Sequence, residues 1–125
     1  MQYIGRIDKN KFVGILANIS SDEVIITDER IQHINNGRGS EFYETYSKYF
    51  SDVISDPDII FEDKKYTAAV VKRIDDGVQH LNLILRLVAP DNDGEFKNSI
   101  ITAIGIGDKR LETYRKNKKI VYKKE

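Results

Sequence analysis

Two apolar runs that lie close together in the chain restrict what this sequence can fold into. LNLILRLV begins at Leu81, SIITAIGIG begins at Ser99, and the turn-forming segment APDNDGEFKN separates them. Such runs, bounded by turn residues, are typical of β-strands, and nearly continuous apolarity is typical of strands in the middle of a sheet. We therefore expect a central β-hairpin that other elements cover.

Helical signals dominate the first half of the chain. Thr27 and the acidic residues after it are typical of an N-cap and first turn, so we predict a helix over 28–36 that ends at Gly37. Ser40 is expected to cap a second helix, which covers the sheet. The apolar stripe of this second helix consists of Phe42, Tyr46, Tyr49, Phe50 and Val53. Before Thr27, the patterns predict an edge strand over 1–8, a short helix over 11–19 and a strand at EVIIT.

The second half of the chain predicts a β-meander. Pro57 ends the second helix because proline disfavours helical backbone at the preceding residue. The strands IIFED and YTAAVVKRI follow, and a turn at 75–77 leads into the central hairpin. A short helix near 111–115 and a last strand, IVYK, are expected at the end. Short turns join antiparallel strands. We therefore predict one α+β domain over 1–125, with N-terminal helices packed on one face of a four-stranded, or slightly larger, antiparallel β-meander.

The composition disfavours several kinds of site. The 125 residues include no cysteine and only two histidines, His33 and His80, so neither disulfides nor a multi-histidine metal site is expected. His80 follows a turn and is expected to be exposed. DNDGEF imitates a calcium loop, but Phe96 stands where that loop requires glycine, and we interpret the segment as a hairpin turn. Because the sequence contains no membrane span, we expect a cytoplasmic protein. We also expect that it uses neither metal nor cofactor.

The charges are unevenly distributed although their sum is zero. Residues 109–125 hold eight Lys or Arg and two acidic residues, and the first 108 residues carry the opposite imbalance. A basic end of this kind indicates nucleic acid or an acidic partner. The alternative is a solvated, lysine-rich segment without a partner. The acidic first 108 residues disfavour unassisted binding of nucleic acid.

Three polar residues interrupt the central hairpin: Arg86, Ser99 and Thr102. A guanidinium inside a central strand is costly to desolvate unless an anion meets it, which points to a phosphate. The alternatives are that Arg86 pairs with Glu62 or Asp63, and that both hydroxyl residues are ordinary members of a strand.

Two further residues suit phosphate chemistry. His33 lies on the predicted first helix, and histidine is the residue type that best suits proton transfer. Arg38 lies in the glycine-rich loop that follows, and the fork of arginine fits phosphate oxygens. Cleavage of RNA without a metal needs a base for the 2′-hydroxyl, an acid for the leaving 5′-oxygen and fixed cations for the phosphorane charge. Taken alone, a single histidine on a helix is more often structural than catalytic.

The succession of segments resembles the phage-associated nucleases of the barnase/EndoU/colicin/RelE superfamily, which share the BECR fold. The resemblance spans about Asp22 to Lys123. Its most specific pieces are the "ER..HI" helix, the "PD.I" entry into the sheet, the "L.L..RL" strand and the "SIITA" strand. The resemblance implies N-terminal helices on a four-stranded antiparallel sheet, and a nuclease activity.

Carried over residue by residue, the resemblance implies catalytic roles at four positions. His33 is the helix histidine, Arg86 is the sheet cation, and Ser99 with Thr102 is the polar pair of the last strand. Related sequences often carry a second histidine shortly after the first, where this chain offers only Arg38. Either a tyrosine therefore serves as the second proton carrier, or activity has been lost.

We accordingly expect a metal-independent endoribonuclease of toxin or phage-effector type that leaves a cyclic phosphate. Arg38, Arg30 and Lys72 are assigned to substrate binding. The expected partners are an RNA substrate and an immunity protein or antitoxin, without a membrane. One alternative is a non-catalytic RNA- or protein-binding module on the same fold, with its affinity supplied by the basic end. Another is a phage accessory or inhibitor protein that binds only protein.

Overall fold

A computed structural model describes residues 1–91 and 97–125 of the protein. Within these residues, seven strands form one mixed sheet in the order β1-β2-β6-β5-β4-β3-β7. The strands are β1 Gln2–Arg6, β2 Glu23–Ile26, β3 Ile59–Glu62, β4 Thr67–Arg73, β5 His80–Arg86, β6 Asn98–Ile106 and β7 Ile120–Lys123. Most of the predicted turn at DNDGEF, residues 92–96, lies outside the described residues.

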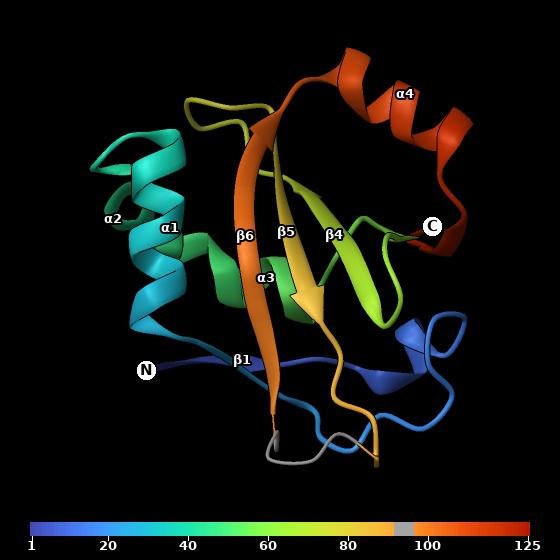
Figure 1. Cartoon of the computed structure of the whole chain (residues 1–125). Helices are drawn as coiled ribbons and strands as arrows, with labels where there is room; N and C mark the ends of the chain where they lie inside the picture. Colours follow the sequence, from blue (N-terminus) through green and yellow to red (C-terminus); the bar gives the residue numbers. More distant parts are fainter. Residues whose placement is uncertain (92–96) are drawn as a thin grey trace.

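Helical segments lie on both sides of the sheet and at its edge (Figure 1). They are η1 Lys9–Phe12, α1 Asp28–Arg38, α2 Phe42–Tyr46, η2 Ser47–Tyr49, α3 Phe50–Ser55 and α4 Asp108–Asn117. Figure 1 shows α3 behind the central strands, α1 beside β6, and α4 across one end of the sheet. We call the side that α3 covers the closed face and the other side the open face.

The α+β class is confirmed, but the sheet is larger than predicted and is mixed. β3, β4, β5 and β6 pair antiparallel in chain order. β7 joins β3 at one edge, whereas β1 and β2 join on the β6 side. β2 runs parallel to β6 over only Val24 and Ile25. Local sequence patterns identify strands, but the partner of each strand is set by contacts between distant segments.

Apolar side chains cover both faces of the central strands. Leu83 and the other alternate leucines of β5 point to the closed face, where they belong to one cluster with Phe50 of α3. On the open face, Val71 of β4 belongs to a second cluster with Leu111 of α4. Burial on both faces explains why these strands carry nearly continuous apolar runs.

The basic C-terminal segment is part of this fold. The predicted short helix near 111–115 is the longer α4, and the predicted strand IVYK is β7, which pairs with β3. α4 packs on the open face, which the prediction of helices on one face did not include. In the described part of the chain, every helix is too short or too polar to cross a lipid bilayer.

The chain is held at the start of β6 by the buried side chain of Asn98. Its Nδ2 donates to the carbonyl oxygens of Ser21 at 2.7 Å and Glu23 at 3.0 Å, and its Oδ1 accepts from the Val88 N–H at 2.8 Å. Asn98 has no exposed surface. These three bonds therefore tie β2, β6 and the end of β5 together without help from solvent.

The first long helix begins as predicted but ends later. Thr27 is the N-cap, and its Oγ1 accepts from the Arg30 N–H at 3.2 Å. The helix continues through Gly37 to Arg38, and Gly39 closes it with a φ of 113°. Arg38 holds the additional residues against the sheet, because its Nε donates to the carbonyl oxygen of Ala103 in β6 at 3.2 Å.

The aromatic segment that follows is not one helix. Ser40 caps nothing, since α2 begins after Glu41 without a side-chain cap. The tight turn of η2 then separates α2 from α3. Phe50 and Val53 are buried and the earlier aromatic side chains pack against the same cluster. The stripe therefore serves the core as expected, but from two short helices that meet at a bend.

Of the predicted helix over 11–19, only the 3-10 helix η1 contributes, and it ends at Phe12. The chain beyond it runs close to β7, where a Cβ added at Gly14 would lie 3.0 Å from Val121 Cγ1. This close approach leaves little room for a side chain at position 14, and glycine also disfavours the predicted helix.

Alanine substitutions at the two glycines near the end of α1 test where the helix stops. Gly37 is helical with open space around it, so Gly37→Ala should stabilise the protein by about 0.5–1 kcal/mol. Gly39→Ala should destabilise it by about 1 kcal/mol or more, because alanine disfavours a φ of 113°. Urea denaturation of both variants measures the difference. Equal effects would contradict an end at Gly39.

Asn98→Asp keeps the size of the side chain but removes its donor group. The carboxylate would face the carbonyl oxygens of Ser21 and Glu23, so we expect a loss of about 2–4 kcal/mol in the free energy of unfolding. Asn36→Asp, at an exposed position on α1, is the control and should change stability by less than about 0.5 kcal/mol. A loss of similar size in both variants would refute the role given to Asn98.

Candidate active site

A β-bulge in β6 decides which hydroxyl groups reach the open face. The register shifts between Ile84 and Leu85 of β5, so that β6 holds one extra residue, Ile101. Residues three apart on a regular strand point to opposite faces. Because of the bulge, Ser99 and Thr102 both point to the open face.

Arg86 lies beside these hydroxyls. It pairs with Ser99 of β6 on one side and with Thr67 of β4 on the other. Directly paired residues point to the same face, and neighbouring strands are about 5 Å apart. Arg86, Ser99 and Thr102 therefore form one polar group on the open face.

The sequence argument for Arg86 assumed that its guanidinium is buried in a central strand. That assumption was wrong, although the position of Arg86 suits an anion. Arg86 is the last residue of β5 and is exposed, so its guanidinium remains in contact with water. The alternative pairing is absent as well: among the described residues, Arg86 makes no ion pair with Glu62 or Asp63, and Asp63 binds Lys118 at 2.9 Å. The guanidinium of Arg86 is thus accessible to a ligand.

His33 and Arg30 lie together on α1, where they line a pocket with Glu29, Gln32 and Asn36. The opposite flank carries Asn35, whose Oδ1 accepts from the Tyr43 N–H of α2 at 3.0 Å. Two residues along a helix turn the side chain by about 200°, so His33 points away from α2, and Arg30 shares its side. The His33 ring is exposed there.

Arg38 reaches the sheet directly. Its Nε lies 3.2 Å from the carbonyl oxygen of Ala103, the residue after Thr102. β2 pairs with β6 only as far as Ser99, and Arg38 occupies the edge of β6 beyond that point. Arg38 also lines a pocket with Phe42 of α2 and with Val78, the turn residue before β5.

Lys72 does not join this group. It pairs with Leu81, which points to the closed face, and its Nζ binds the backbone oxygen of Asp56 at 2.8 Å and the Asp56 carboxylate at 3.1 Å. The structure therefore brings Arg86, Ser99 and Thr102 together on the open face. It leaves out Lys72, and it places the α1 residues in other pockets, His33 with Arg30 in one and Arg38 in another.

His80 is buried, contrary to the expectation that it is exposed. It begins β5, retains 5% of its surface, and its Nε2 lies 2.7 Å from Asp108 Oδ1 in α4. Arg73 also donates to that oxygen, at 3.0 Å. The sequence contained a signal for this: in HLNLILR, His80, Asn82 and Arg86 occupy alternate positions, as the polar side chains of one face of a strand do.

The carboxylate of Asp108 joins α4 to the sheet. Hydrogen bonding from His80, and next the positive charge of Arg73, lower the pKa of Asp108 below its ordinary 3.8. Gln79 completes the contact, since its Nε2 donates to Asp108 Oδ2 at 3.1 Å and its Oε1 accepts from the Asp108 N–H at 2.8 Å. This group fixes the start of the helix over the open face.

The open face gathers donors rather than carboxylates. Arg86, Arg38 and the hydroxyls of Ser99 and Thr102 all offer hydrogen to an acceptor, which suits the oxygens of a phosphate. Among the residues that the structure describes, no three His, Asp or Glu side chains are grouped as ligands of a metal ion. This arrangement can bind and polarise a phosphodiester.

Comparison with known proteins identifies the family. The family model described as phage-Barnase-EndoU-ColicinE5/D-RelE like nuclease2 matches residues 2–123. The chain belongs to this nuclease family. The resemblance drawn from the sequence is therefore confirmed, and it extends over nearly the whole chain of this family member. Searches among curated proteins and among solved structures found no significant match.

Asp108→Asn tests the contact between α4 and the sheet. A carboxyl with a lowered pKa in the folded state adds stability that is present above its unfolded pKa and is lost as the pH falls through its folded pKa. The substitution should therefore lower the melting temperature at neutral pH, and the difference from the wild type should shrink below about pH 4. Thermal melts between pH 7 and pH 2.5 measure this. Asp52→Asn, at an exposed position of α3, is the control, and a difference that stays constant to pH 2.5 would contradict the role of Asp108.

Proposed function

We propose that this nuclease-family protein is a metal-independent endoribonuclease of toxin or phage-effector type. It cleaves RNA by attack of a 2′-hydroxyl on the adjacent phosphate and leaves a 2′,3′-cyclic phosphate and a 5′-hydroxyl. The observation that carries the proposal is the bulge in β6, which directs Ser99 and Thr102 to the same face as Arg86. His33 lies on α1, which packs beside β6 (Figure 1).

The phosphate is held by the cations and oriented by the hydroxyls. Arg86 and Arg38 bind the non-bridging oxygens, whose negative charge grows as the phosphorane forms. Ser99 and Thr102 donate to the same oxygens from β6. Arg30, on the α1 flank, binds a neighbouring phosphate. The contact of Arg38 with Ala103 holds that donor in place, which limits the reorganisation that accompanies the reaction.

His33 carries one of the two protons that the reaction moves. A base takes the proton of the 2′-hydroxyl, the oxygen forms a bond to phosphorus, and the bond from phosphorus to the 5′-oxygen breaks as an acid protonates that oxygen. We assign the second proton to Tyr66, which lines a pocket of about 270 Å³ with Arg86. Tyr66 is held at a φ of 59°, and its carbonyl accepts from the Leu87 N–H at 2.8 Å. Such strain at a non-glycine residue is frequent at functional sites.

A toxin of this kind requires a protein that restrains it in the cell that makes it. An immunity protein or antitoxin that covers the open face with acidic side chains would mask Arg86 and His33 together. This partner follows from the proposed activity and from the cationic character of the site.

Cleavage of a labelled RNA in excess EDTA tests the proposal. We expect 2′,3′-cyclic phosphate ends, a loss of about 10²–10⁴ in rate for His33→Ala, and about a hundredfold loss for Arg86→Ala, because a base or acid and a charge-stabilising donor are removed. Tyr66→Phe and Thr102→Val, which each remove one hydroxyl, should lower the rate as well. An RNA with a 2′-deoxynucleotide at the cleaved position should stay intact.

Arg110→Ala is the matched control, since Arg110 is exposed on α4 outside the site. Its rate should equal that of the wild type. Intact RNA with folded wild-type protein would refute the nuclease, and salt-dependent RNA binding in its place would favour a non-catalytic binding module. Cleavage that His33→Ala leaves unchanged would refute the site.

A further inference from the structure

Two apolar side chains at one side of the sheet serve neither core of the protein. Tyr3 of β1 retains 56% of its surface, and Ile25 of β2 is half-buried. Within the described part of the chain, neither belongs to the cluster under α3 or to the cluster under α4. The Tyr3 hydroxyl makes no hydrogen bond with a described residue, whereas that of Tyr43 donates to Gln2 Oε1 at 2.7 Å. Packing of the fold therefore does not explain these two side chains.

Ile25 and Tyr3 both point to the open face. The neighbours of Ile25 in β2, Val24 and Ile26, belong to the cluster of the closed face, and side chains alternate along a strand. Ile25 is also paired with Ser99 of β6, a residue of the candidate site. Tyr3 pairs with Ile25 across β1 and β2, so it points the same way.

These pairs form one row across the open face. The row consists of Tyr3, Ile25, Ser99 and Arg86, which come from β1, β2, β6 and β5. Neighbouring strands are about 5 Å apart, so the backbone of Tyr3 lies about 10 Å from that of Ser99 and about 15 Å from that of Arg86. A nucleic-acid strand with one phosphate at Arg86 therefore brings a neighbouring base within reach of Tyr3.

An acidic residue on this part of the open face is neutralised. Glu23 lies two residues before Ile25 in β2 and therefore on the same face. It forms an ion pair with Lys97, and Nη2 of Arg6 lies 3.9 Å from its carboxylate. Glu23 consequently does not repel a phosphate chain that passes along the row.

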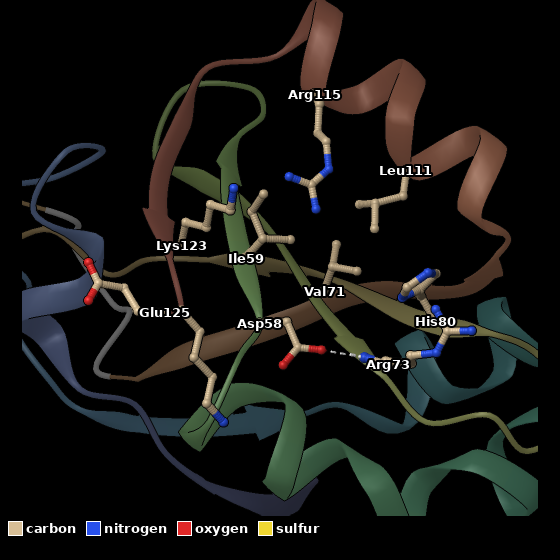
Figure 2. A pocket seen from close by; sticks show the side chains of 10 residues that line it. Asp58, Ile59, Val71, Arg73, His80, Leu111, Arg115, Lys123 and Glu125 are labelled. Carbon is tan, nitrogen blue, oxygen red and sulfur yellow. Dashed lines mark hydrogen bonds between the residues drawn. The ribbon is translucent and has the colours of Figure 1, made fainter.

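The cavity of about 340 Å³ beneath α4, on the same face, offers no comparable surface (Figure 2). Its apolar residues, Ile59, Val71 and Leu111, are buried in the second core cluster and retain at most 8% of their surface. A flat ligand has no apolar surface to stack on there, in contrast to the exposed ring of Tyr3.

We propose that Tyr3 and Ile25 form a subsite for a nucleobase of the bound RNA strand. The base stacks on the ring of Tyr3 and packs against Ile25, while Ser99 and Arg86 hold a phosphate of the same strand. Single exposed aromatic residues are common on protein surfaces, and it is the position of Tyr3 in the row with Arg86 that indicates a ligand. The identification of the strand as RNA rests on the proposed function.

The chemistry of this surface favours a base over a protein partner. Proteins hold single-stranded nucleic acid by combining positive charge for the backbone with aromatic rings on which bases stack. A stable protein interface needs about 800 Å² on each partner, much more than two side chains offer. Because every base has a flat face, the subsite accepts any of the four bases.

Binding of a short labelled 2′-O-methyl RNA, followed by fluorescence anisotropy, tests the subsite without cleavage, because the methyl group blocks the attacking hydroxyl. Tyr3→Ala should weaken binding about tenfold, since stacking on the ring is lost, and Tyr3→Phe should keep the affinity within about twofold. Val13→Ala is the control. It shortens a similarly exposed apolar side chain, 54% exposed, after η1, and should leave the affinity within about twofold.

A strand with the same sugar and phosphate units but no bases separates stacking from charge. Wild-type protein should bind this abasic strand about tenfold more weakly, and Tyr3→Ala should cause no further loss with it. Arg86→Ala should weaken binding of both strands by a similar factor, because it removes a phosphate contact. Equal wild-type affinity for the two strands, an equal loss with both in Tyr3→Ala, no loss in Tyr3→Ala, or no binding of either strand would each overturn the subsite.

The subsite and the cleavage reaction are tested independently. Binding that requires both Tyr3 and the bases, together with intact RNA in the cleavage assay, would refute the reaction and keep the subsite. Cleavage that His33→Ala abolishes, together with binding that Tyr3→Ala leaves unchanged, would refute the subsite and keep the nuclease.

Discussion

The register of β6 against β5 determines which side chains of β6 point to the open face. Asn98 fixes the start of β6 by three hydrogen bonds inside the protein, and the bulge at Ile101 shifts all that follows by one residue. A shift of one residue exchanges the two faces of a strand. Without the bulge, Ser99 and Thr102 would point to opposite sides of the sheet, and only one hydroxyl would stand with Arg86. The buried amide and the bulge therefore set the local chemistry of the site.

The two faces of the sheet are used differently. On the closed face, the alternate leucines of β5 pack beneath the short helices, and Lys72 is bound there to Asp56. The open face is covered only at one end, where α4 is held by Asp108 on His80 and Arg73. That coverage leaves two accessible areas on one surface, the polar group near Arg86 and the cavity beneath α4.

The uneven distribution of charge along the sequence is explained by the place of the basic segment in the fold. The first 108 residues are acidic and the last 17 are basic, which by sequence alone argues against nucleic-acid binding by the first part. In the structure the basic segment is not a tail, because α4 packs on the open face and β7 extends the sheet. Arg115 and Lys123 are thereby placed on the same face as Arg86. The positive charge of the C-terminal segment thus complements the site built by the acidic part.

The sequence by itself determined the strands of the meander, the start of α1 at Thr27, and the family, because these follow from apolar periodicity, a local cap and short motifs. It also indicated Arg86, Ser99 and Thr102 as a group, although the argument from burial of Arg86 was mistaken. Only the tertiary structure decided which face each of them occupies, that His80 is buried against Asp108, and that Lys72 lies on the other side. The direction of a strand side chain depends on pairing with a distant segment, and the burial of a histidine depends on a helix that follows it by 28 residues. Neither the direction of the side chain nor the burial of the histidine can be predicted from a local sequence pattern.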